Sequence, residues 1–334
     1  MTDVTLTEAE GRAFITRALM AANVSEANAA TVARALVAAE VEGQSGHGFS
    51  RVPAYAAQAR AGKVKGHAEP VVTQPATGAL LVDAAHGFAY PAIDTAIAAL
   101  PGIVAESGIA AAAITRSHHC GQLSAHVERL AEAGCLALMV ANAPKAMAPW
   151  GGNAPLFGTN PIAFAVPRRG EPPLVVDLSL SKVARGKVML AAKRGEDIPE
   201  GWAIDVDGKP TTDAAAALPG SMIPAGDAKG AALAMMVEIM AVSLTGAQYS
   251  YEASSFFDDK GDPPGVGQYI IAIRPETTAG AAFHDRIDAL IAEILAQPGT
   301  RLPGQKRLTG RAAAAERGVT IPKALHDEIA ALAG

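Results

Sequence analysis

The hydrophobic pattern of the chain changes its period near residue 79, and this change restricts the chain to folds that combine a helical part with a sheet. Before that point, apolar residues such as Phe14, Ala18 and Leu19 recur at helical spacing. After it, short apolar runs at 79–83 and 109–115 alternate with helical segments. Alternation with short links is typical of α/β or α+β proteins. We therefore expect a mixed α/β fold with a helical N-terminal region.

Capping residues, glycines and prolines set the expected boundaries of the elements. Thr7 and Glu10 form a capping-box pair before the first helix, and Ser25 caps a second helix that stops at Gly43. Further helices are expected at 52–61, 92–100 with a break at Pro101-Gly102 and a continuation to 107, 123–133, 182–193, 229–244, 283–295 and 322–332; strands are expected at 79–83, 109–115, 136–142, 161–166, 174–178 and 268–273. The part before residue 79 is expected to be entirely helical.

Composition narrows the class of protein. Half of the 334 residues are hydrophobic and 18% are charged, which indicates a globular protein. Lys and Arg number 28 against 33 Asp and Glu, and the net charge of −5 argues against a nucleic-acid partner. The chain has no apolar run of membrane-spanning length and begins with acidic residues, unlike a signal peptide. Cys120 and Cys135 cannot build a disulfide framework, which favours the reducing cytoplasm.

The Rossmann dinucleotide fingerprint is absent from the sequence. The nearest approaches to Gly-x-Gly-x-x-Gly are Gly46-His47-Gly48 and Gly265-Val266-Gly267, and both lack the third glycine. Neither opens a helix directly behind a strand, which the pyrophosphate geometry requires. A nucleotide that binds to this chain must therefore use another loop arrangement.

Residues 42–51 form the first segment with candidate chemistry. Glycines on both sides of His47 let a ligand approach the backbone closely. The guanidinium of Arg51 has the geometry to bind a carboxylate with two hydrogen bonds. The alternative is a loop at a helix end with one exposed histidine.

Residues 115–122 form the second such segment, with His118, His119 and Cys120 at the end of an expected strand. Ligand sites of α/β folds tend to lie at such strand ends. A zinc site needs a second ligand pair at regular spacing, which the chain does not supply, so we expect no metal. A catalytic or cofactor-binding histidine and a purely structural segment remain open.

Four more segments are rich in residue types that bind anions or nucleotides. They are the Gly-, Pro- and Asn-rich loop 148–161, the strand end 177–181 followed by Arg185-Gly186-Lys187, the helix start 226–230, and the basic turn 301–307. Asp177 suits a pair of ribose hydroxyls or, equally, a helix N-cap. Lys229 with free backbone N–H groups suits a phosphate, unless Asp227 simply caps the helix. The acidic stretch 257–262 is expected to be a solvated turn.

Together these segments resemble the malate/L-lactate dehydrogenase type-2 family over nearly the whole chain. The matching motifs are Gly-His-Gly-x-x-Arg at 46–51, Ser-x-His-x-Gly at 117–121, Trp-Gly-Gly through Gly-Thr-Asn-Pro at 150–161, Asp-Leu-Ser at 177–179, Lys-Gly at 229–230, Pro-Pro-x-Val-Gly-Gln at 263–268 and Leu-Pro-Gly-x-x-Arg at 302–307. Each motif is weak alone, whereas seven in one order are specific. The family includes ureidoglycolate, sulfolactate and malate dehydrogenases and Δ1-piperideine-2-carboxylate reductases.

The resemblance implies a homodimeric NAD(P)-dependent enzyme on a fold unlike the Rossmann domain. It implies a helical, substrate-binding part made of residues 1–115 and 280–334, and an NAD(P)-binding domain of residues 116–279. The residues that it implies are His47, His119 and Lys187 for catalysis; Arg51, Thr159 and Trp150 for the substrate; and His118, Gly121, Gln122, Ala143, Thr159, Asp177, Leu178, Ser179, Arg185, Lys229, Gly230, Gln305 and Arg307 for the cofactor.

Two departures from the family pattern bear on the chemistry. Gly46 stands where the family commonly has a serine, which argues against a hydroxyl relay to His47. Lys187 stands where imine-reducing members tend to carry an acid, and a cation better suits the anionic groups of a 2-oxo acid. We therefore expect hydride transfer between the nicotinamide and C2 of a small 2-hydroxy or 2-oxo acid of the malate, lactate or sulfolactate type. The alternatives are a Δ1-piperideine-2-carboxylate or Δ1-pyrroline-2-carboxylate reductase and a non-catalytic NAD(P)-binding protein.

The choice between NAD and NADP depends on the charge beside the adenosine ribose. A carboxylate such as Asp177 binds ribose hydroxyls and favours NAD, whereas a cation binds the 2′-phosphate of NADP. The candidate cations are Lys182, Arg185, Lys306 and Arg307. The two interpretations nearly cancel, and we expect NAD by a small margin.

Overall fold

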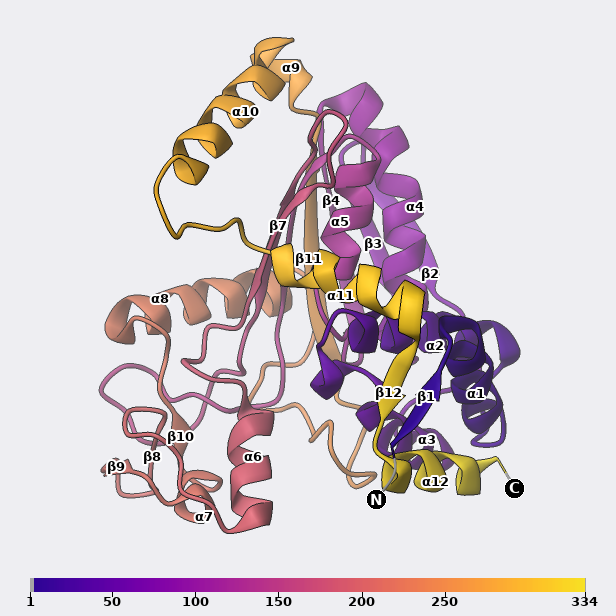
Figure 1. Cartoon of the computed structure of the whole chain (residues 1–334), viewed down its shortest axis with the longest axis vertical. Coiled ribbons are helices and arrows are strands. Elements are labelled where there is room, and N and C mark those ends of the chain that lie inside the picture. The colour runs from indigo at the N-terminus through magenta and orange to yellow at the C-terminus, as the bar shows by residue number, and fades with distance from the viewer. Residues whose placement is uncertain (1–2, 334) are drawn as a thin grey trace.

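The computed structural model describes residues 3–333, which form a seven-stranded mixed sheet with helices packed around it (Figure 1). Three hydrophobic clusters make up the core. The first cluster joins the N-terminal helices to the C-terminal one. The second lies between the sheet and the two helices on one of its faces. The third lies on the opposite face, under the segments that follow β7. This is the mixed α/β architecture that the sequence predicts.

The N-terminal helices form as expected from their caps. They are α1 (Glu8–Met20), α2 (Glu26–Val41) and α3 (Val52–Arg60). Thr7 and Glu10 make the reciprocal capping box, and the Ser25 side chain accepts from the backbone N–H of Asn28. The expectation of an entirely helical part before residue 79 is wrong, because β1 (Val4–Leu6) pairs antiparallel with β12 (Val319–Ile321), and β2 (Val71–Ala76) pairs with β3 (Ala79–Asp83) in the central sheet. The β1–β12 ladder and α12 (Lys323–Leu332) fasten the C-terminal end of the chain to α1 and α3.

Seven strands form the central sheet in the order β2-β3-β4-β11-β5-β6-β7. Their bounds are β2 (Val71–Ala76), β3 (Ala79–Asp83), β4 (Ile109–Ser117), β5 (Leu136–Ala141), β6 (Ile162–Val166), β7 (Leu174–Leu178) and β11 (Val266–Ile273). Alternate residues of β4, such as Ala110, Ala112 and Ile114, are buried, as a period of two requires. All pairs are antiparallel except β3 with β4.

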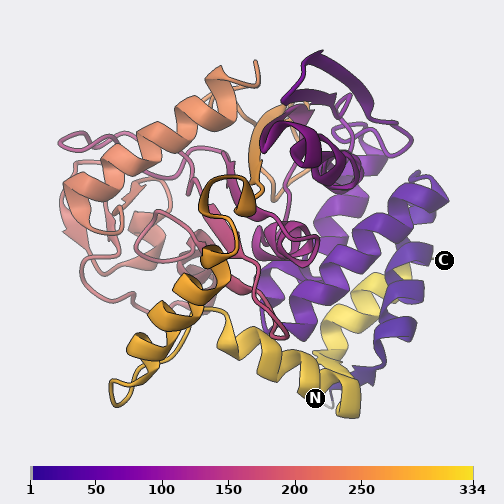
Figure 2. The ribbon, with the colours of Figure 1, turned by 90° about the horizontal axis from the view of Figure 1, so that it is seen from above.

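Helices α4 (Ala89–Ser107) and α5 (Ser124–Glu132) cover one face of the sheet (Figures 1 and 2). The expected break at Pro101-Gly102 is wrong, because α4 continues through Pro101. The buried side chains of Ile97, Leu100 and Val104 lie on both sides of this proline in the sheet–helix core. Their burial outweighs the loss of one helical hydrogen bond at the proline.

The remaining elements lie on the other face and at one end of the sheet, except α11, which lies against α2 and forms ion pairs with α5. They are α6 (Arg185–Arg194), β8 (Ala203–Ile204), β9 (Pro210–Thr211), α7 (Ala214–Ala217), β10 (Ser221–Met222), α8 (Asp227–Glu238), the π-helical turn η3 (Ile239–Ser243), α9 (Glu276–Ala279), α10 (Ala282–Leu295) and α11 (Gln305–Arg317). The helix expected at 229–244 is therefore two elements, because the backbone changes to π-helical hydrogen bonding at Ile239. Figure 1 shows α9 and α10 as an arm at one end of the sheet.

The central sheet includes strands from both predicted domains, since β3 and most of β4 precede residue 116 whereas β5, β6, β7 and β11 follow it. The boundaries at 115/116 and 279/280 stay a prediction about the substrate and cofactor regions. No helix within residues 3–333 combines the length and apolar character needed to cross a membrane.

Candidate active site

A cavity of about 700 Å³ opens at one end of the central sheet. The C-terminal ends of β4, β5 and β7 and the start of β6 meet there, together with η1 (Ser45–His47), η2 (Phe49–Arg51) and the loop before β11. Eleven of the sequence-predicted site residues line it: His47, Arg51, His119, Gly121, Gln122, Ala143, Thr159, Asp177, Leu178, Ser179 and Arg185. Segments far apart in the chain thus converge on one hollow.

A glycine between two short helical turns presents His47 and Arg51 to the cavity. A Cβ on Gly48 would lie 2.1 Å from Oε2 of Glu40, so no larger residue fits without displacing that carboxylate. The same oxygen accepts a hydrogen bond of 2.9 Å from the Phe49 N–H. Arg51 Nε donates to the Gly46 carbonyl at 2.6 Å, which folds the guanidinium back over the segment.

The second histidine segment follows an irregularity near the end of β4, where Arg116 has a φ of +47° and the pairing with β11 shifts its register. His118 lies behind the cavity wall, where its Nε2 hydrogen-bonds to Oε1 of Gln58 at 2.7 Å. His119 faces the cavity, and its Nδ1 hydrogen-bonds to the Tyr55 hydroxyl at 2.5 Å. The Tyr55 and Tyr90 hydroxyls are 3.1 Å apart, so two buried phenols support the back of the His119 ring.

The rings of His47 and His119 stack at a centroid distance of 5.1 Å with an interplanar angle of 12°. Burial lowers the pKa of His47 to about 4, and the charge of Arg51 contributes in the same direction. Burial, followed by the charges of Arg51, His47 and His118, holds the pKa of His119 well below its ordinary value. Both imidazoles are therefore neutral near pH 7, beside a guanidinium that stays charged.

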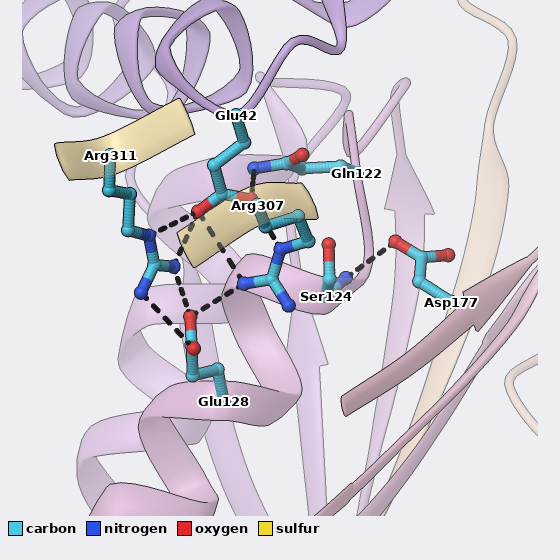
Figure 3. Close-up of polar contacts among 7 residues, drawn as sticks. All are labelled: Glu42, Gln122, Ser124, Glu128, Asp177, Arg307 and Arg311. Atoms are coloured by element: carbon cyan, nitrogen blue, oxygen red, sulfur yellow. Dashed lines mark hydrogen bonds and ion pairs between the residues drawn. The ribbon is translucent and has the colours of Figure 1, made fainter. Parts of the chain in front are cut away.

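The opposite wall contains the residues expected to bind the cofactor. Asp177 Oδ2 accepts a hydrogen bond of 2.7 Å from the Ser124 N–H at the start of α5, so this carboxylate supports a helix N-terminus from another segment (Figure 3). Burial raises the pKa of Asp177. Gly158 allows close packing of the loop that precedes Thr159, since a Cβ there would lie 2.2 Å from the Ala143 carbonyl oxygen.

Seven of the predicted site residues do not line the cavity. Lys187, Lys229 and Gln305 are exposed elsewhere, and 60% of Trp150 is exposed. Gly230 packs tightly against the Ala225 backbone, and His118 lies behind the wall. The seventh, Arg307, is buried in an ion network.

Arg307 and Arg311, on α11, bind two buried carboxylates, Glu42 at the end of α2 and Glu128 on α5 (Figure 3). Arg307 lies 2.6 Å from Glu42 and 2.7 Å from Glu128. Gln122, which lines the cavity, donates to Glu42 at 2.9 Å. Burial raises the pKa of Glu42, and both arginines more than offset this, so the pKa is lowered. Arg307 thus has two carboxylate partners within the protein.

Several residues of the site escaped the sequence analysis. Tyr55 has the spacing of an ordinary core residue in α3, and nothing local marks Tyr90 as its partner. Phe256 and Phe257 also line the cavity, although the stretch 257–262 was expected to be a solvated turn. Within the described part of the chain, no group of three or more His, Cys, Asp or Glu side chains is arranged to hold a metal ion.

Comparisons with known proteins identify the family to which the chain belongs. The family model described as malate/L-lactate dehydrogenase matches residues 6–330. The chain is 51% identical over 332 residues, 99% of this chain and 98% of the other, to a (2R)-3-sulfolactate dehydrogenase (NADP(+)) of Chromohalobacter salexigens. It is 42% identical, over 98% of this chain and 99% of the other, to a Δ1-pyrroline-2-carboxylate/Δ1-piperideine-2-carboxylate reductase of Pseudomonas aeruginosa. The crystal structure of the Δ1-piperideine-2-carboxylate reductase of Pseudomonas syringae superposes with a TM-score of 0.93 at 36% identity, covering 98% of this chain and 99% of that one.

The fold and the site define an NAD(P)-dependent oxidoreductase. The chain belongs to the malate/L-lactate dehydrogenase family, and the resemblance found in its motifs is confirmed.

Because Arg307 neutralises two buried carboxylates, Arg307→Ala should lower the free energy of unfolding by about 3–5 kcal/mol. Arg12→Ala removes an exposed pair with Glu8 and should change it by less than about 1 kcal/mol. The folded-state pKa of Glu42 is lowered, so its contribution is present at neutral pH and is lost as the pH falls through that pKa. Urea unfolding at several pH values measures both effects. Unchanged stability with a weakened Kd for the cofactor would instead make Arg307 a cofactor ligand.

Proposed function

We propose that the protein is an NADP-dependent dehydrogenase of a small anionic 2-hydroxy acid of the 3-sulfolactate kind. The observation that carries the proposal is an arginine without a carboxylate partner beside two neutral, stacked histidines. Among the described residues, Arg51 contacts the Gly46 carbonyl and the ring of Phe257, and it forms no ion pair. Such a charge in a half-enclosed cavity binds an anion strongly, because the site excludes much of the water.

In this proposal Arg51 binds the substrate carboxylate and thereby fixes C2 relative to the imidazoles. One histidine accepts the hydroxyl proton during oxidation and returns it during reduction. His47 is the first candidate because it lines the cavity beside Arg51 and its ring makes no hydrogen bond within the described structure. His119, whose Nδ1 is already bonded to Tyr55, orients the pair. A bound nicotinamide supplies the acceptor or donor of hydride at its C4 position.

The cavity suits a dinucleotide in size and in its polar groups. Its volume of about 700 Å³ falls in the range of cofactor sites. The buried Oε1 of Gln122 has no partner within the described residues and offers an acceptor. We propose that the cofactor-binding wall consists of Gly121, Gln122, Ala143, Thr159, Asp177, Leu178, Ser179 and Arg185.

The proposal of NADP replaces the small preference for NAD. It is supported by the relative at 51% identity, whose name states NADP(+). Of the four candidate cations, Arg185 lines the cavity, whereas Lys182 and Lys306 are exposed outside it and Arg307 is paired. Arg185 is therefore our candidate for the 2′-phosphate.

A reductase of cyclic imines is the second candidate function. The superposition with the Pseudomonas syringae reductase supports it. The sequence analysis argued against an imine because Lys187 stands where imine-reducing members tend to carry an acid. That argument is weakened, because Lys187 is exposed and lies outside the cavity lining. The higher identity to the sulfolactate dehydrogenase favours the hydroxy acid.

We also propose a homodimer in the cytoplasm. Helix α8 and the turn after it expose Leu233, Met235, Met236 and Ile239, each at 42% or more, which is unusual for a monomer surface. Both cysteines are free and buried, which is consistent with a reducing compartment.

The substrate proposal predicts that sulfopyruvate is reduced with the highest kcat/KM in a panel that also contains oxaloacetate, pyruvate, Δ1-pyrroline-2-carboxylate and Δ1-piperideine-2-carboxylate. The reason is that Arg51 offers the substrate a guanidinium with no ion pair among the described residues, and that the relative at 51% identity is named as a sulfolactate dehydrogenase. Initial rates of NADPH oxidation measure the ranking. Turnover of the cyclic imines alone would overturn the proposal.

The cofactor proposal predicts a ratio of kcat/KM for NADPH to that for NADH well above one. Arg185→Gln should lower this ratio, because it removes the cation that meets the 2′-phosphate. Lys182→Gln is the matched control, since this nearby lysine lies outside the cavity lining. A wild-type ratio below one would contradict the choice of NADP, and an unchanged ratio in Arg185→Gln would contradict the role of Arg185.

The pKa of His47 predicts the pH profile of hydroxy-acid oxidation. A base must be neutral to accept a proton, so kcat/KM should stay high down to about pH 5 and fall with a midpoint near pH 4. His47→Gln should remove this acid limb and lower turnover on the order of 10²–10⁴-fold with little change in cofactor Kd. A midpoint near pH 6.5, or wild-type turnover in His47→Gln, would show that His47 is not the base.

A further inference from the structure

A buried lysine lies directly behind the candidate active site. The side chain of Lys63, just after α3, is only 1% exposed. Its Nζ donates to three backbone carbonyls, those of Ser255 at 2.7 Å, Lys260 at 2.7 Å and Asp258 at 3.0 Å. A carboxylate oxygen of Asp258 lies farther away, at 3.4 Å. The three N–H groups of the ammonium are therefore matched by three carbonyl oxygens of one loop.

This loop, residues 253–260, forms part of the cavity wall. The ring of Phe257 lies against Arg51, with 4.7 Å between its centroid and the guanidinium carbon. The ring of Phe256 lies 5.3 Å from that of His119. Gln58 adds a second support from α3, because its amide donates to the Phe256 carbonyl at 2.9 Å. The loop thus contacts both the anion-binding arginine and the histidine pair.

The loop has no regular secondary structure to maintain this shape. Residues 253–260 are neither helix nor strand, so their carbonyls are not bonded in a ladder. Without the ammonium, three carbonyls that now converge would face one another with no donor between them, which is unfavourable in a buried position. A neutral side chain of the same length would fill the space and leave the carbonyls unpaired.

We propose that Lys63 is a positioning residue for substrate binding, which holds the loop 253–260 so that Phe257 aligns Arg51 toward the substrate carboxylate. The inference rests on the proposed function only in so far as it assigns the carboxylate to Arg51. The acidic stretch at 257–262 is accordingly part of the cavity wall, and two of its backbone carbonyls accept hydrogen bonds from the Lys63 ammonium. Lys63 itself acts through the loop and touches neither substrate nor cofactor.

The test is Lys63→Ala with chemical rescue by n-propylammonium, which replaces the deleted carbons and the charge. Misplacement of Arg51 should lower kcat/KM for sulfopyruvate about 100-fold, mostly through KM, with the Kd of NADPH unchanged. Millimolar n-propylammonium should restore most of the loss, whereas 1-propanol, with the same carbons and no charge, should not. Lys65→Ala removes an exposed lysine two residues away and should behave as wild type with or without the amine.

Hydrogen exchange gives a readout that needs no substrate. Amides of residues 253–262 should exchange faster in Lys63→Ala than in wild type, and n-propylammonium should slow them again. This result would support the proposal even if sulfopyruvate were not turned over, so failure of the substrate assignment is distinguishable from failure of this inference. Unchanged exchange in the loop, unchanged KM, or equal restoration by 1-propanol would overturn it.

A second variant keeps the inference falsifiable if Lys63→Ala does not fold. Phe257→Leu leaves Lys63 and its carbonyls in place and removes the ring that contacts Arg51. It should raise KM for sulfopyruvate and not respond to n-propylammonium, because the lesion lies beyond the ammonium. A wild-type KM in Phe257→Leu would show that the loop does not position Arg51.

Discussion

An ion network of two buried carboxylates, one buried guanidinium and one partly exposed guanidinium fixes the relative positions of three remote segments. Glu42 ends α2, Glu128 lies on α5, and both arginines come from α11. Each buried charge carries a desolvation penalty of several kcal/mol unless its partners remain in place, so the three segments have little freedom to shift. Gln122 belongs to the same network and lines the cavity. The position of that wall is therefore set by ion pairs outside the cavity.

The direction of the strands explains why no dinucleotide fingerprint is present. That fingerprint places a pyrophosphate on a helix that directly follows a parallel strand. Here a single parallel pair, β3 with β4, is joined by α4, and every other neighbour in the sheet is antiparallel. Loops from strand ends and strand starts therefore meet at the same end of the sheet. A cofactor held there contacts several short segments, which is consistent with seven weak motifs in place of one strong one.

The sequence predicted well those features that depend on neighbouring residues. The capping box at Thr7 and the strand at 79–83 each follow from a few adjacent positions. The ladder of β1 with β12 was missed because three-residue strands carry almost no local pattern and their partners lie some three hundred positions apart. Ten of the eleven predicted residues that reached the cavity lie in segments that the sequence pattern had already marked, whereas Ala143 and the assignment of roles came from the family resemblance. Arg307 did not reach the cavity, because its residue type is compatible with a phosphate and its actual partner, Glu42, is 265 positions away.

The affinity of the site for an anion depends on Arg51 having no carboxylate partner within the described structure. Had the loop 253–260 been held by a carboxylate–arginine pair at this place, that carboxylate would compete with an anionic substrate for the guanidinium. The structure secures the loop with Lys63 and backbone carbonyls, which carry only partial charge. Arg51 is left with a carbonyl and an aromatic face, so its charge is not neutralised within the described structure. Burial, and after it the same charge, keeps the pKa of His47 low. One uncompensated cation therefore favours both an anionic substrate and a neutral base beside it.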